Sequence, residues 1–286
     1  YLYQLKHINK IAGIQDGNLI LQTTAKKLED LCGRNAFRIT GKRFLVLTDS
    51  LEEYEYYFAQ LKNLFDVNMQ PDTNDKKIMI PVILSGIVNA EKIGESGLIL
   101  EYAEYLESLA PQSGLTEVIQ DDRQTMNGFL YNKQVEQYLH TAISEDLFEV
   151  YYQPVYSLKE KRFITLEALS RLRHPDMGMI PPDVFINIAE RQGEVSQIAL
   201  LQFRRVCGFV KENEQIMEKI KNVKFNLSPS ELMKPGYSQK LIDVIREYGL
   251  KSEYFQFEIT ESVATEYSES FCSAVEDFNK AGIQLC

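Results

Sequence analysis

The sequence has few of three features that would decide its class at once: paired cysteines, long apolar runs and clusters of basic residues. Its four cysteines, Cys32, Cys207, Cys272 and Cys286, show no CxxC motif and no regular spacing, so we interpret them as reduced thiols of a cytoplasmic protein. No apolar run is long enough to span a bilayer, and no signal-peptide pattern is present. The basic residues are dispersed and the formal net charge is −10, which argues against a nucleic-acid groove but not against a small nucleotide.

The length of the chain predicts two domains. Its 286 residues suffice for two parts that each bury their own core. Tyr1 begins inside an apolar run without a start methionine, and Cys286 ends inside another. We therefore expect a fragment of a longer protein that is cytoplasmic, or that is the cytoplasmic part of a larger, membrane-anchored sensor.

The first half predicts an α+β domain. Apolar residues at helical spacing predict helices, and two short apolar runs around the turn Thr40–Arg43 predict strands. Helices packed on one face of a mainly antiparallel sheet suit this order, and residues 121–131 predict a helical connector. The expected helices are Gly17–Leu31, Leu51–Phe65 and Gly97–Leu109, and the expected strands are Ala36–Ile39, Phe44–Thr48 and Lys77–Val88.

The second half alternates strands with helices. This alternation predicts a parallel sheet, in either an open doubly wound fold or a barrel, and both place their sites at the carboxyl ends of strands. The expected strands are Phe148–Val155, Arg162–Leu169, Val223–Leu227, Tyr254–Ile259 and Ile283–Cys286. The expected helices are Pro182–Gln192, Val195–Glu212, Ser238–Tyr248 and Ser268–Ala281.

Polar residues recur at the ends of these apolar runs. The run FITLEALSRL carries Glu167 and Arg171, a carboxylate and a guanidinium that suit a site holding a metal and a phosphate together. A charged loop after a core strand is the alternative for this segment alone. The pattern repeats, however, because Asn226 closes a second run and Glu258 a third. Carboxylate and amide oxygens are the ligands that Mg²⁺ or Mn²⁺ prefers.

The motifs of the second half resemble those of the EAL domain family of cyclic di-GMP phosphodiesterases. The resemblance implies a TIM-type (β/α) barrel over residues 133–286, incomplete here because a full barrel typically needs ~250 residues. Leu172 stands where the family often has tryptophan, and this change keeps an apolar contact. The matching segments are Tyr152-Gln153-Pro154, Glu167-Ala168-Leu169, Arg171, Arg173-His174-Pro175, Ile180-Pro181-Pro182, Phe185-Ile186, Ala189-Glu190, Asn226-Leu227-Ser228 and Glu258-Ile259-Thr260-Glu261.

This resemblance implies a role for each site residue. Glu167, Asn226 and Glu258 correspond to ligands of a two-metal Mg²⁺ or Mn²⁺ site, and Glu167 thereby serves catalysis. Glu261 corresponds to an acid that braces a catalytic loop, and it is the second residue with a catalytic role. Gln153 and Arg171 correspond to substrate contacts, since the forked donors of arginine suit a phosphate. For His174 we expect loop structure rather than a general base, and Glu190 fits either a binding residue or a helix surface.

The first half resembles a degenerate GGDEF domain, the diguanylate cyclase family, which has a ferredoxin-like α+β fold. The similarity lies in Arg38–Phe44 and in the segment from Ile8 to Asn18. A cyclase needs carboxylates that hold two cations, but Lys42 and Arg43 replace the signature acids and Tyr1 replaces the upstream one. Cyclase activity is therefore not expected. For Asn9 we expect structural packing, and contact with GTP or another guanine nucleotide in a regulatory role is the alternative. The expected organisation is residues 1–115 as this domain, 116–132 as a helical linker and 133–286 as the EAL domain.

Two functions remain open. The first is a metal-dependent phosphodiesterase that hydrolyses cyclic di-GMP to linear pGpG and carries an inactive, regulatory cyclase-like domain. The second is a receptor that binds cyclic di-GMP without hydrolysis and signals through protein partners. We also expect a homodimer through the EAL domain. The family's paired aspartates and its later lysine, glutamate and glutamine would lie beyond Cys286.

Overall fold

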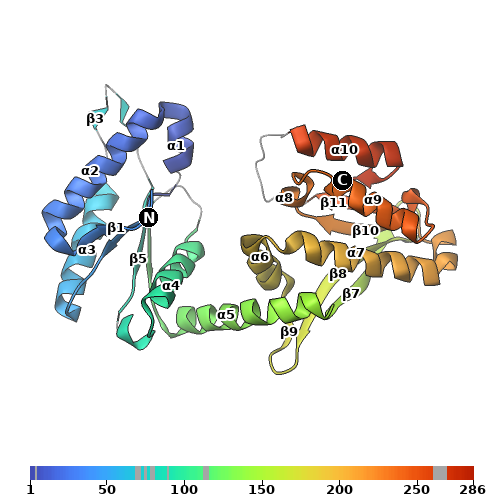
Figure 1. Ribbon diagram of the computed structural model, residues 1–286, viewed down its shortest axis with the longest axis horizontal. Coiled ribbons are helices and arrows are strands. Elements are labelled where there is room, and N and C mark those ends of the chain that lie inside the picture. Colours follow the sequence, from blue (N-terminus) through green and yellow to red (C-terminus); the bar gives the residue numbers. More distant parts are fainter. Residues whose placement is uncertain are drawn as a thin grey trace. The chain divides into compact units, whose positions relative to one another are not determined.

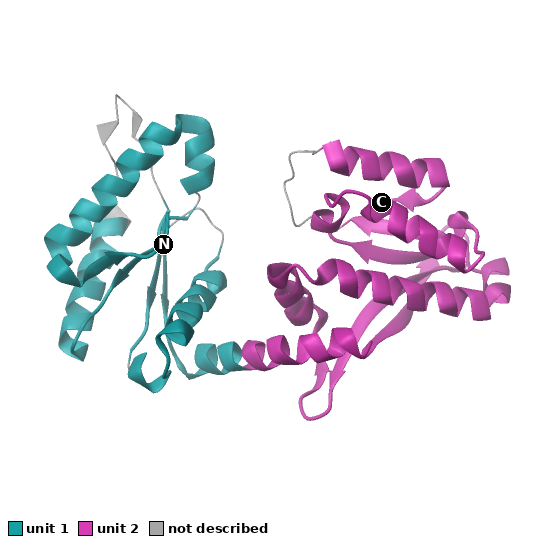
Figure 2. Ribbon diagram, viewed as in Figure 1, with its two compact units in different colours: residues 1–130 teal, residues 131–286 magenta. Residues whose placement is uncertain are grey.

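A computed structural model describes residues 1–3, 5–67, 72–73, 76–77, 81–88, 90–111, 116–259 and 269–286. The chain forms two compact units, residues 1–130 and 131–286, which Figure 2 shows in teal and magenta. No helix in the described ranges is long and apolar enough to cross a membrane. The boundary between the units falls within helix α5 (Arg123–Ser144).

Unit 1 contains the expected helices with longer ends. Strands β1 and β2 form an antiparallel hairpin, as expected. Within the expected strand from Lys77 to Val88, the described residues include β5 and Lys77, the last residue of β4, in extended conformation, and residues 78–80 lie outside the described part. A strand that the sequence did not predict, β6, precedes α5 and pairs parallel with β5. The elements are α1 (Leu5–Ala12), α2 (Ile14–Cys32), β1 (Ala36–Arg38), β2 (Phe44–Val46), α3 (Leu51–Val67), β3 (Asp72–Thr73), β4 (Lys76–Lys77), β5 (Ile83–Gly86), α4 (Ser96–Leu109) and β6 (Glu117–Gln120).

Two apolar clusters hold unit 1 together. The larger one packs Leu5, Ile20 and Leu28 of the first two helices against Leu61 of α3 and Val82 beside β5. Burial of side chains of this size stabilises by roughly 1.5–3 kcal/mol each. The second cluster joins Tyr102 and Leu106 of α4 to Phe129 of α5. The ferredoxin-like arrangement stays a prediction, since the described strands form separate pairs.

Unit 2 follows the predicted order of strands and helices closely (Figure 1). After α5 come β7 (Phe148–Ser157), β8 (Arg162–His174), β9 (Gly178–Ile180), α6 (Pro182–Gln192), α7 (Val195–Glu212), β10 (Asn222–Leu227), α8 (Pro229–Leu232), α9 (Tyr237–Glu247), β11 (Phe255–Ile259), α10 (Glu269–Ala281) and β12 (Gln284–Leu285). The strands lie in the order β12-β11-β10-β8-β7, with β9 also paired to β8. This linear order forms an open sheet within the described residues.

The expectation of a wholly parallel sheet was wrong at one edge. Strands β8, β10, β11 and β12 are parallel, but β7 and β9 both run antiparallel to β8. The connection between β7 and β8 is a tight turn in which Lys161 adopts a φ of 52°. So short a connection can join only antiparallel neighbours, because a parallel pair needs a crossover of a dozen or more residues.

The sheet of unit 2 has one apolar and one polar face. Val223, Phe225 and Leu227 of β10 are buried, and they pack with Phe203 of α7 and Phe257 of β11. The alternate residues of β10 are half-buried or exposed, and all are polar. Side chains in a strand alternate between faces, so the helices cover one face and the polar residues gather on the other.

Candidate functional site

The polar face of unit 2 carries every described residue that the sequence analysis assigned to the site. In the strand register Gln153 of β7 lies opposite Glu167 of β8, and Glu167 lies opposite Lys224 of β10. Asn226, two residues after Lys224, lies opposite Glu258 of β11. Because register partners share a face of the sheet, the residues of four neighbouring strands form one continuous polar surface.

Glu167 lies in the middle of its strand and not at the end. The sequence analysis placed the end of the strand near Leu169, but β8 continues to His174. Its last residues pair with the start of β7 on one side and with β9 on the other. These pairings satisfy the backbone hydrogen bonds that would otherwise end the strand. Glu167 therefore projects from a rigid element, and its Oε1 lies 3.4 Å from Nδ2 of Asn226, which donates to it.

Glu258 is paired with a residue that the sequence analysis did not consider. Nζ of Lys224 lies 3.4 Å from Oε2 of Glu258, and their side chains are 26% and 40% exposed. The signal was present in the sequence, because a lysine stands between two buried apolar residues of the strand Asn222–Leu227. A charge in that position has to point to the face opposite the apolar core.

A row of hydrogen bonds runs across the same face beside the carboxylates. Thr165 of β8 donates to Oδ1 of Asn222 at 3.0 Å, and Nδ2 of Asn222 donates to Oε1 of Gln256 at 3.2 Å. The row links β8, β10 and β11. Hydrogen-bonded side chains in successive strands fix the register, so they hold Glu167 and Glu258 at constant spacing.

Arg171 lies on the same strand as Glu167, four residues further on, and so on the same face. Its Nη1 donates to the carbonyl of Ser170 at 2.7 Å, and its guanidinium lies 5.7 Å from the ring centre of Tyr151. The side chain is half-buried. A guanidinium held over an aromatic ring keeps free donors for a planar anion such as a phosphate.

His174 has a structural part, as the sequence analysis expected. Its Nδ1 accepts hydrogen bonds from the backbone N–H groups of Asp176 and Met177, at 3.0 and 3.2 Å. Its ring meets that of Tyr138 edge to face, with 4.5 Å between centroids. These contacts stabilise the β8–β9 turn.

The oxygen donors of the polar face fit a hard divalent cation. Glu167 and Glu258 offer carboxylates and Asn226 an amide carbonyl, all on adjacent strands. Among the described residues there is no group of three or more His, Cys, Asp or Glu side chains that could hold a metal. Glu261 lies outside the residues that the structure describes.

A buried carboxyl group supports the chain just after Asn226. The N–H of Ser228 donates to Oε2 of Glu231 at 2.9 Å, as part of a capping box at the start of α8. The hydroxyl of Tyr237 donates to the other oxygen, Oε1, at 2.8 Å. Oγ of Ser228 in turn donates to Oε1 of Glu190 on α6 at 2.8 Å, and Glu190 is exposed.

Burial raises the pKa of Glu231 to about 7. Repulsion by the charge of Glu190 contributes to this rise in the pKa, whereas the hydrogen bonds from Ser228 and Tyr237 and the charge of Lys234 oppose it. Burial likewise raises the pKa of the Tyr237 hydroxyl, with the Glu231 carboxylate adding to the shift. Glu231 is 2% exposed, so its ionised form is costly.

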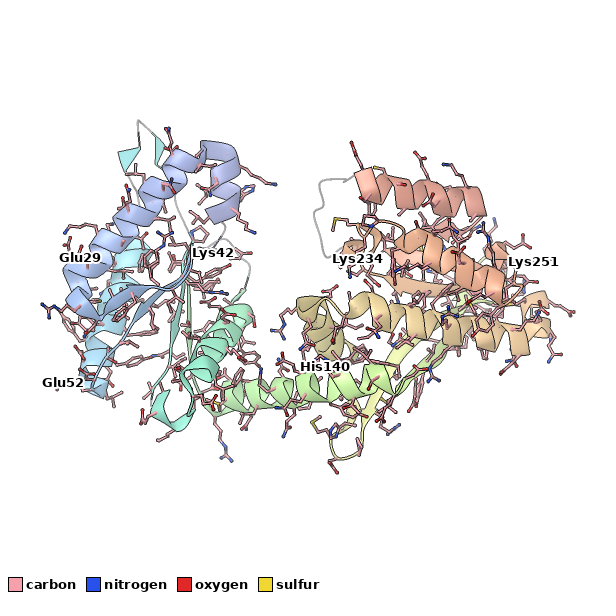
Figure 3. The ribbon with its side chains drawn as sticks, in the orientation of Figure 1. Glu29, Lys42, Glu52, His140, Lys234 and Lys251 are labelled. Carbon is pink, nitrogen blue, oxygen red and sulfur yellow. The ribbon has the colours of Figure 1, made fainter. Side chains whose placement is uncertain are left out.

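The turn of unit 1 carries cations where a cyclase would need acids. Nζ of Lys42, labelled in Figure 3, donates to the hydroxyl of Tyr1 at 2.8 Å. Arg43 forms ion pairs with Glu104 at 2.7 Å and with Glu107 at 2.9 Å. The acids beside this turn are thus neutralised by arginine, and a second pair of cations would be repelled.

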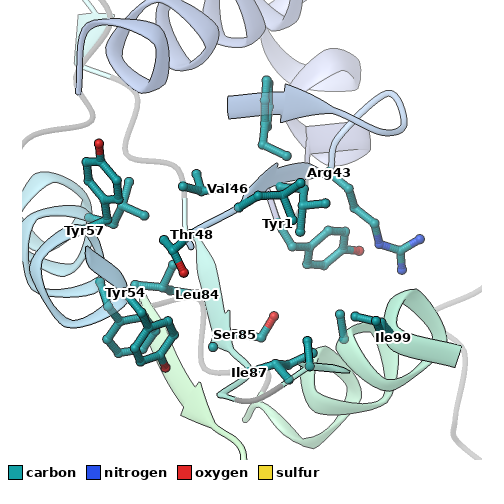
Figure 4. Close-up of a pocket in the computed structure, with 18 of the residues that line it drawn as sticks. Tyr1, Arg43, Val46, Thr48, Tyr54, Tyr57, Leu84, Ser85, Ile87 and Ile99 are labelled. Carbon is teal, nitrogen blue, oxygen red and sulfur yellow. The ribbon is translucent and has the colours of Figure 1, made fainter. Parts of the chain in front are cut away.

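Unit 1 also contains a tightly packed asparagine and a cavity. Asn9 packs tightly against Gly17, where an added Cβ would lie 1.7 Å from Oδ1 of Asn9. That oxygen is buried and has no hydrogen-bond partner within the described part of the chain. A separate cavity of about 530 Å³ lies among β2, β5, α3 and α4, where Figure 4 shows Val46, Leu84 and Ile99 around it. Asn9 does not line this cavity.

Comparison with known proteins identifies the second unit. Residues 136–286 match the EAL domain family. The cyclic di-GMP phosphodiesterase NbdA of Pseudomonas aeruginosa is 23% identical over 99% of this chain and 36% of its own length. The signaling protein YkoW of Bacillus subtilis is 24% identical over the same shares. The chain thus spans about a third of the length of these curated relatives.

Among solved structures, that of the PaMucR phosphodiesterase with c-di-GMP is 24% identical, with a TM-score of 0.49. The match covers 53% of this chain and 62% of that one. The family match covers more than half of the present sequence and includes the strands that carry Glu167, Asn226 and Glu258. The chain belongs to the EAL domain family.

Proposed function

We propose that unit 2 binds cyclic di-GMP and that the protein hydrolyses it to linear pGpG with the help of divalent metal ions. The observation that carries the proposal is the gathering of Gln153, Glu167, Arg171, Asn226 and Glu258 on one polar face. The family membership of residues 136–286 and the relative named as a cyclic di-GMP phosphodiesterase support it.

In this proposal Glu167, Asn226 and Glu258 hold Mg²⁺ or Mn²⁺. The metals would supply activation of water and neutralisation of charge on the phosphoryl oxygens. The protein's own contribution is to keep the three oxygen donors at fixed spacing on paired strands. The capping box that follows Asn226 supports the end of β10, and Glu261 would brace a neighbouring loop.

The substrate contacts in this proposal are Arg171 and Gln153. Arg171 would hold a phosphate through its forked donors, as the half-buried guanidinium over Tyr151 permits. Gln153 is exposed and lies opposite Glu167, so its amide would contact substrate close to the metals.

The test is hydrolysis of cyclic di-GMP by the full-length protein with Mg²⁺ or Mn²⁺, followed by chromatography of pGpG. We expect turnover that stops when a chelator is added and returns with excess metal. Absence of turnover in full-length protein that contains the family's paired aspartates would overturn the proposal. Glu276→Gln is the control, because that exposed residue lies on α10 and pairs with surface Lys280.

A non-hydrolysing receptor for cyclic di-GMP is the second candidate, and one observation favours it. The ammonium of Lys224 already neutralises Glu258, so part of the carboxylate charge is satisfied without metal. Calorimetry separates the two candidates. Tight binding of cyclic di-GMP in chelator, without turnover, supports the receptor, whereas binding that needs metal supports the enzyme.

For unit 1 we propose a degenerate cyclase-like module without cyclase activity, regulatory in role. The cations Lys42 and Arg43 support this reading, since they replace acids that a cyclase needs. For Asn9 we propose a contact with a guanine nucleotide, since its buried Oδ1 has no hydrogen-bond partner among the residues that the structure describes. Titration with GTP and Asn9→Ala tests that contact. We further propose a cytoplasmic location and a homodimer through the EAL domain. Sedimentation of the full-length protein would test the homodimer.

A further inference from the structure

Lys224 forms an ion pair with Glu258, one of the residues proposed above to hold the metal. Its strand, β10, alternates buried and polar residues, and Lys224 shares the polar face with Asn226. Its neighbours in the register are Glu167 on β8 and Gln256 on β11. The lysine is therefore flanked by the strands that carry both carboxylates of the candidate metal site.

The side chain of Lys224 reaches along the sheet toward one of these carboxylates. Its Nζ lies 3.4 Å from Oε2 of Glu258, although the register partner of Glu258 is Asn226. The lysine thus extends diagonally by one pair toward the carboxyl ends of the strands. Only 26% of its side chain is exposed, so the pair is partly sheltered from solvent and its charge is less screened than at the surface.

A cation bound to Glu258 would meet this ammonium at short range. Both positive charges would compete for the same carboxylate, and the repulsion between them would weaken metal binding. We propose that Lys224 is an intrinsic competitor for the metal, a residue that sets the affinity of the EAL site for divalent cations. The proposal rests on the metal-dependent function proposed above, but it concerns binding and not turnover.

The test measures Mn²⁺ binding to the full chain from the loss of the electron paramagnetic resonance signal of free aqueous Mn²⁺. Lys224→Met removes the charge and keeps a long unbranched side chain one atom shorter, and Lys224→Gln removes the charge with a polar end. We expect both variants to bind Mn²⁺ about tenfold more tightly than the wild type, equivalent to about 1.4 kcal/mol. Lys224→Arg keeps the charge and should bind as the wild type does.

The matched control is Lys280→Met. Lys280 pairs with Glu276 on α10 at 3.3 Å, nearly the same distance, but its side chain is 74% exposed and lies away from the polar face. Its loss should leave the Mn²⁺ affinity unchanged. Circular dichroism and thermal unfolding of each variant confirm that the compared chains are folded.

The outcomes separate this proposal from the proposed function. Unchanged or weaker Mn²⁺ binding in both uncharged variants would overturn it, as would the absence of detectable binding in any variant. Tighter binding without hydrolysis of cyclic di-GMP would support the role of Lys224 and count against the phosphodiesterase. If Lys224→Arg tightened Mn²⁺ binding as much as the uncharged variants do, the charge would not be the cause, and the proposal would be overturned.

Discussion

Both units of the chain bring acidic and basic side chains together. In unit 2 two carboxylates surround a lysine, whereas in unit 1 two cations lie at a turn beside acids. In unit 2 the carboxylates of Glu167 and Glu258 lie on the two strands that flank β10, and Lys224 of β10 lies between them. In unit 1 the turn presents Lys42 and Arg43, and the nearby acids Glu104 and Glu107 are paired with Arg43. Among the described residues Glu167 thus accepts from a neutral amide and Glu258 faces one ammonium, whereas both of these acids of unit 1 share one guanidinium. In the function proposed above, the metal ions therefore belong to unit 2.

The strongest way to break this comparison is to remove a carboxylate from unit 2. Glu167→Gln should lower cyclic di-GMP turnover by the full-length protein by a factor of about 10²–10³, the scale of losing one charge-stabilising group. Turnover at saturating Mn²⁺ is the measurement, with Glu276→Gln as the control. Activity within a factor of two of the wild type would remove Glu167 from the site.

Glu231 offers a second test, through the stability of unit 2. Its pKa is raised to about 7 by burial, so the folded state favours the protonated form. The stability that this form contributes is complete below the ordinary pKa of 4.5 and is lost as pH rises through 7. The rise of the pKa from 4.5 to about 7 corresponds to at most about 3 kcal/mol in the free energy of unfolding. The free energy of unfolding in urea should therefore fall more between pH 5 and pH 8 for the wild type than for Glu231→Gln.

This stability test has its own control and its own failure. The carboxyl group faces an acid, Glu190, and a base, Lys234, as well as Tyr237. Because the two charges act in opposite directions, added salt should change the pH dependence of the free energy of unfolding only slightly. Glu276→Gln, an exposed change on α10, should leave the pH dependence as it is in the wild type. Parallel curves for wild type and Glu231→Gln would show that Glu231 does not titrate in this range.

Arg171 sharpens the comparison on the substrate side. Arg171→Ala should weaken binding of cyclic di-GMP by ~1.5–3 kcal/mol, the scale of a hydrogen bond to a charged group. Isothermal titration calorimetry measures the change. Arg246→Ala is the matched control, because Arg246 is exposed and pairs with Asp243 on α9. Equal affinity in Arg171→Ala and the wild type would refute the phosphate contact.

The smallest effect is expected in unit 1. Arg43→Ala removes ion pairs to Glu104 and Glu107, one of which is only 11% exposed, and should destabilise the unit by about 0.5–1 kcal/mol. Chemical denaturation followed by tyrosine fluorescence measures it. Lys42→Glu together with Arg43→Glu should yield no cyclic di-GMP from GTP, because Tyr1 still replaces the upstream acid. Formation of product would contradict the reading of unit 1 as inactive.

The sequence predicted the helices and strands of unit 2 well because their apolar residues follow clear periods. It did not predict that β7 and β9 run antiparallel to β8, since strand direction depends on connections and not on periodicity. Nor did it predict β6 (Glu117–Gln120), which is too short to show an alternation.

The site was predicted in part. Gln153, Glu167, Arg171, Asn226 and Glu258 were chosen from motifs, and the register brings them to one face. Their roles stay predictions, as do the proposed domain boundaries. Lys224 was not predicted because it lies outside the motifs from which the other site residues were chosen. The Glu231–Tyr237 bond was missed for a different reason, since it joins two helices through a buried contact that no local pattern reveals.

The β7–β8 hairpin has a consequence for how the site assembles during folding. Gln153 and Glu167 become neighbours as soon as this hairpin closes, and hairpins of this kind form within about 1–10 μs. Strand β10 pairs with β8, and β11 pairs with β10, over longer sequence separations, so Asn226 and Glu258 should reach this face later. A nascent chain would thus bring Gln153 and Glu167 together first, and the Glu167 carboxylate would stay hydrated until β10 and β11 add Asn226 and Glu258.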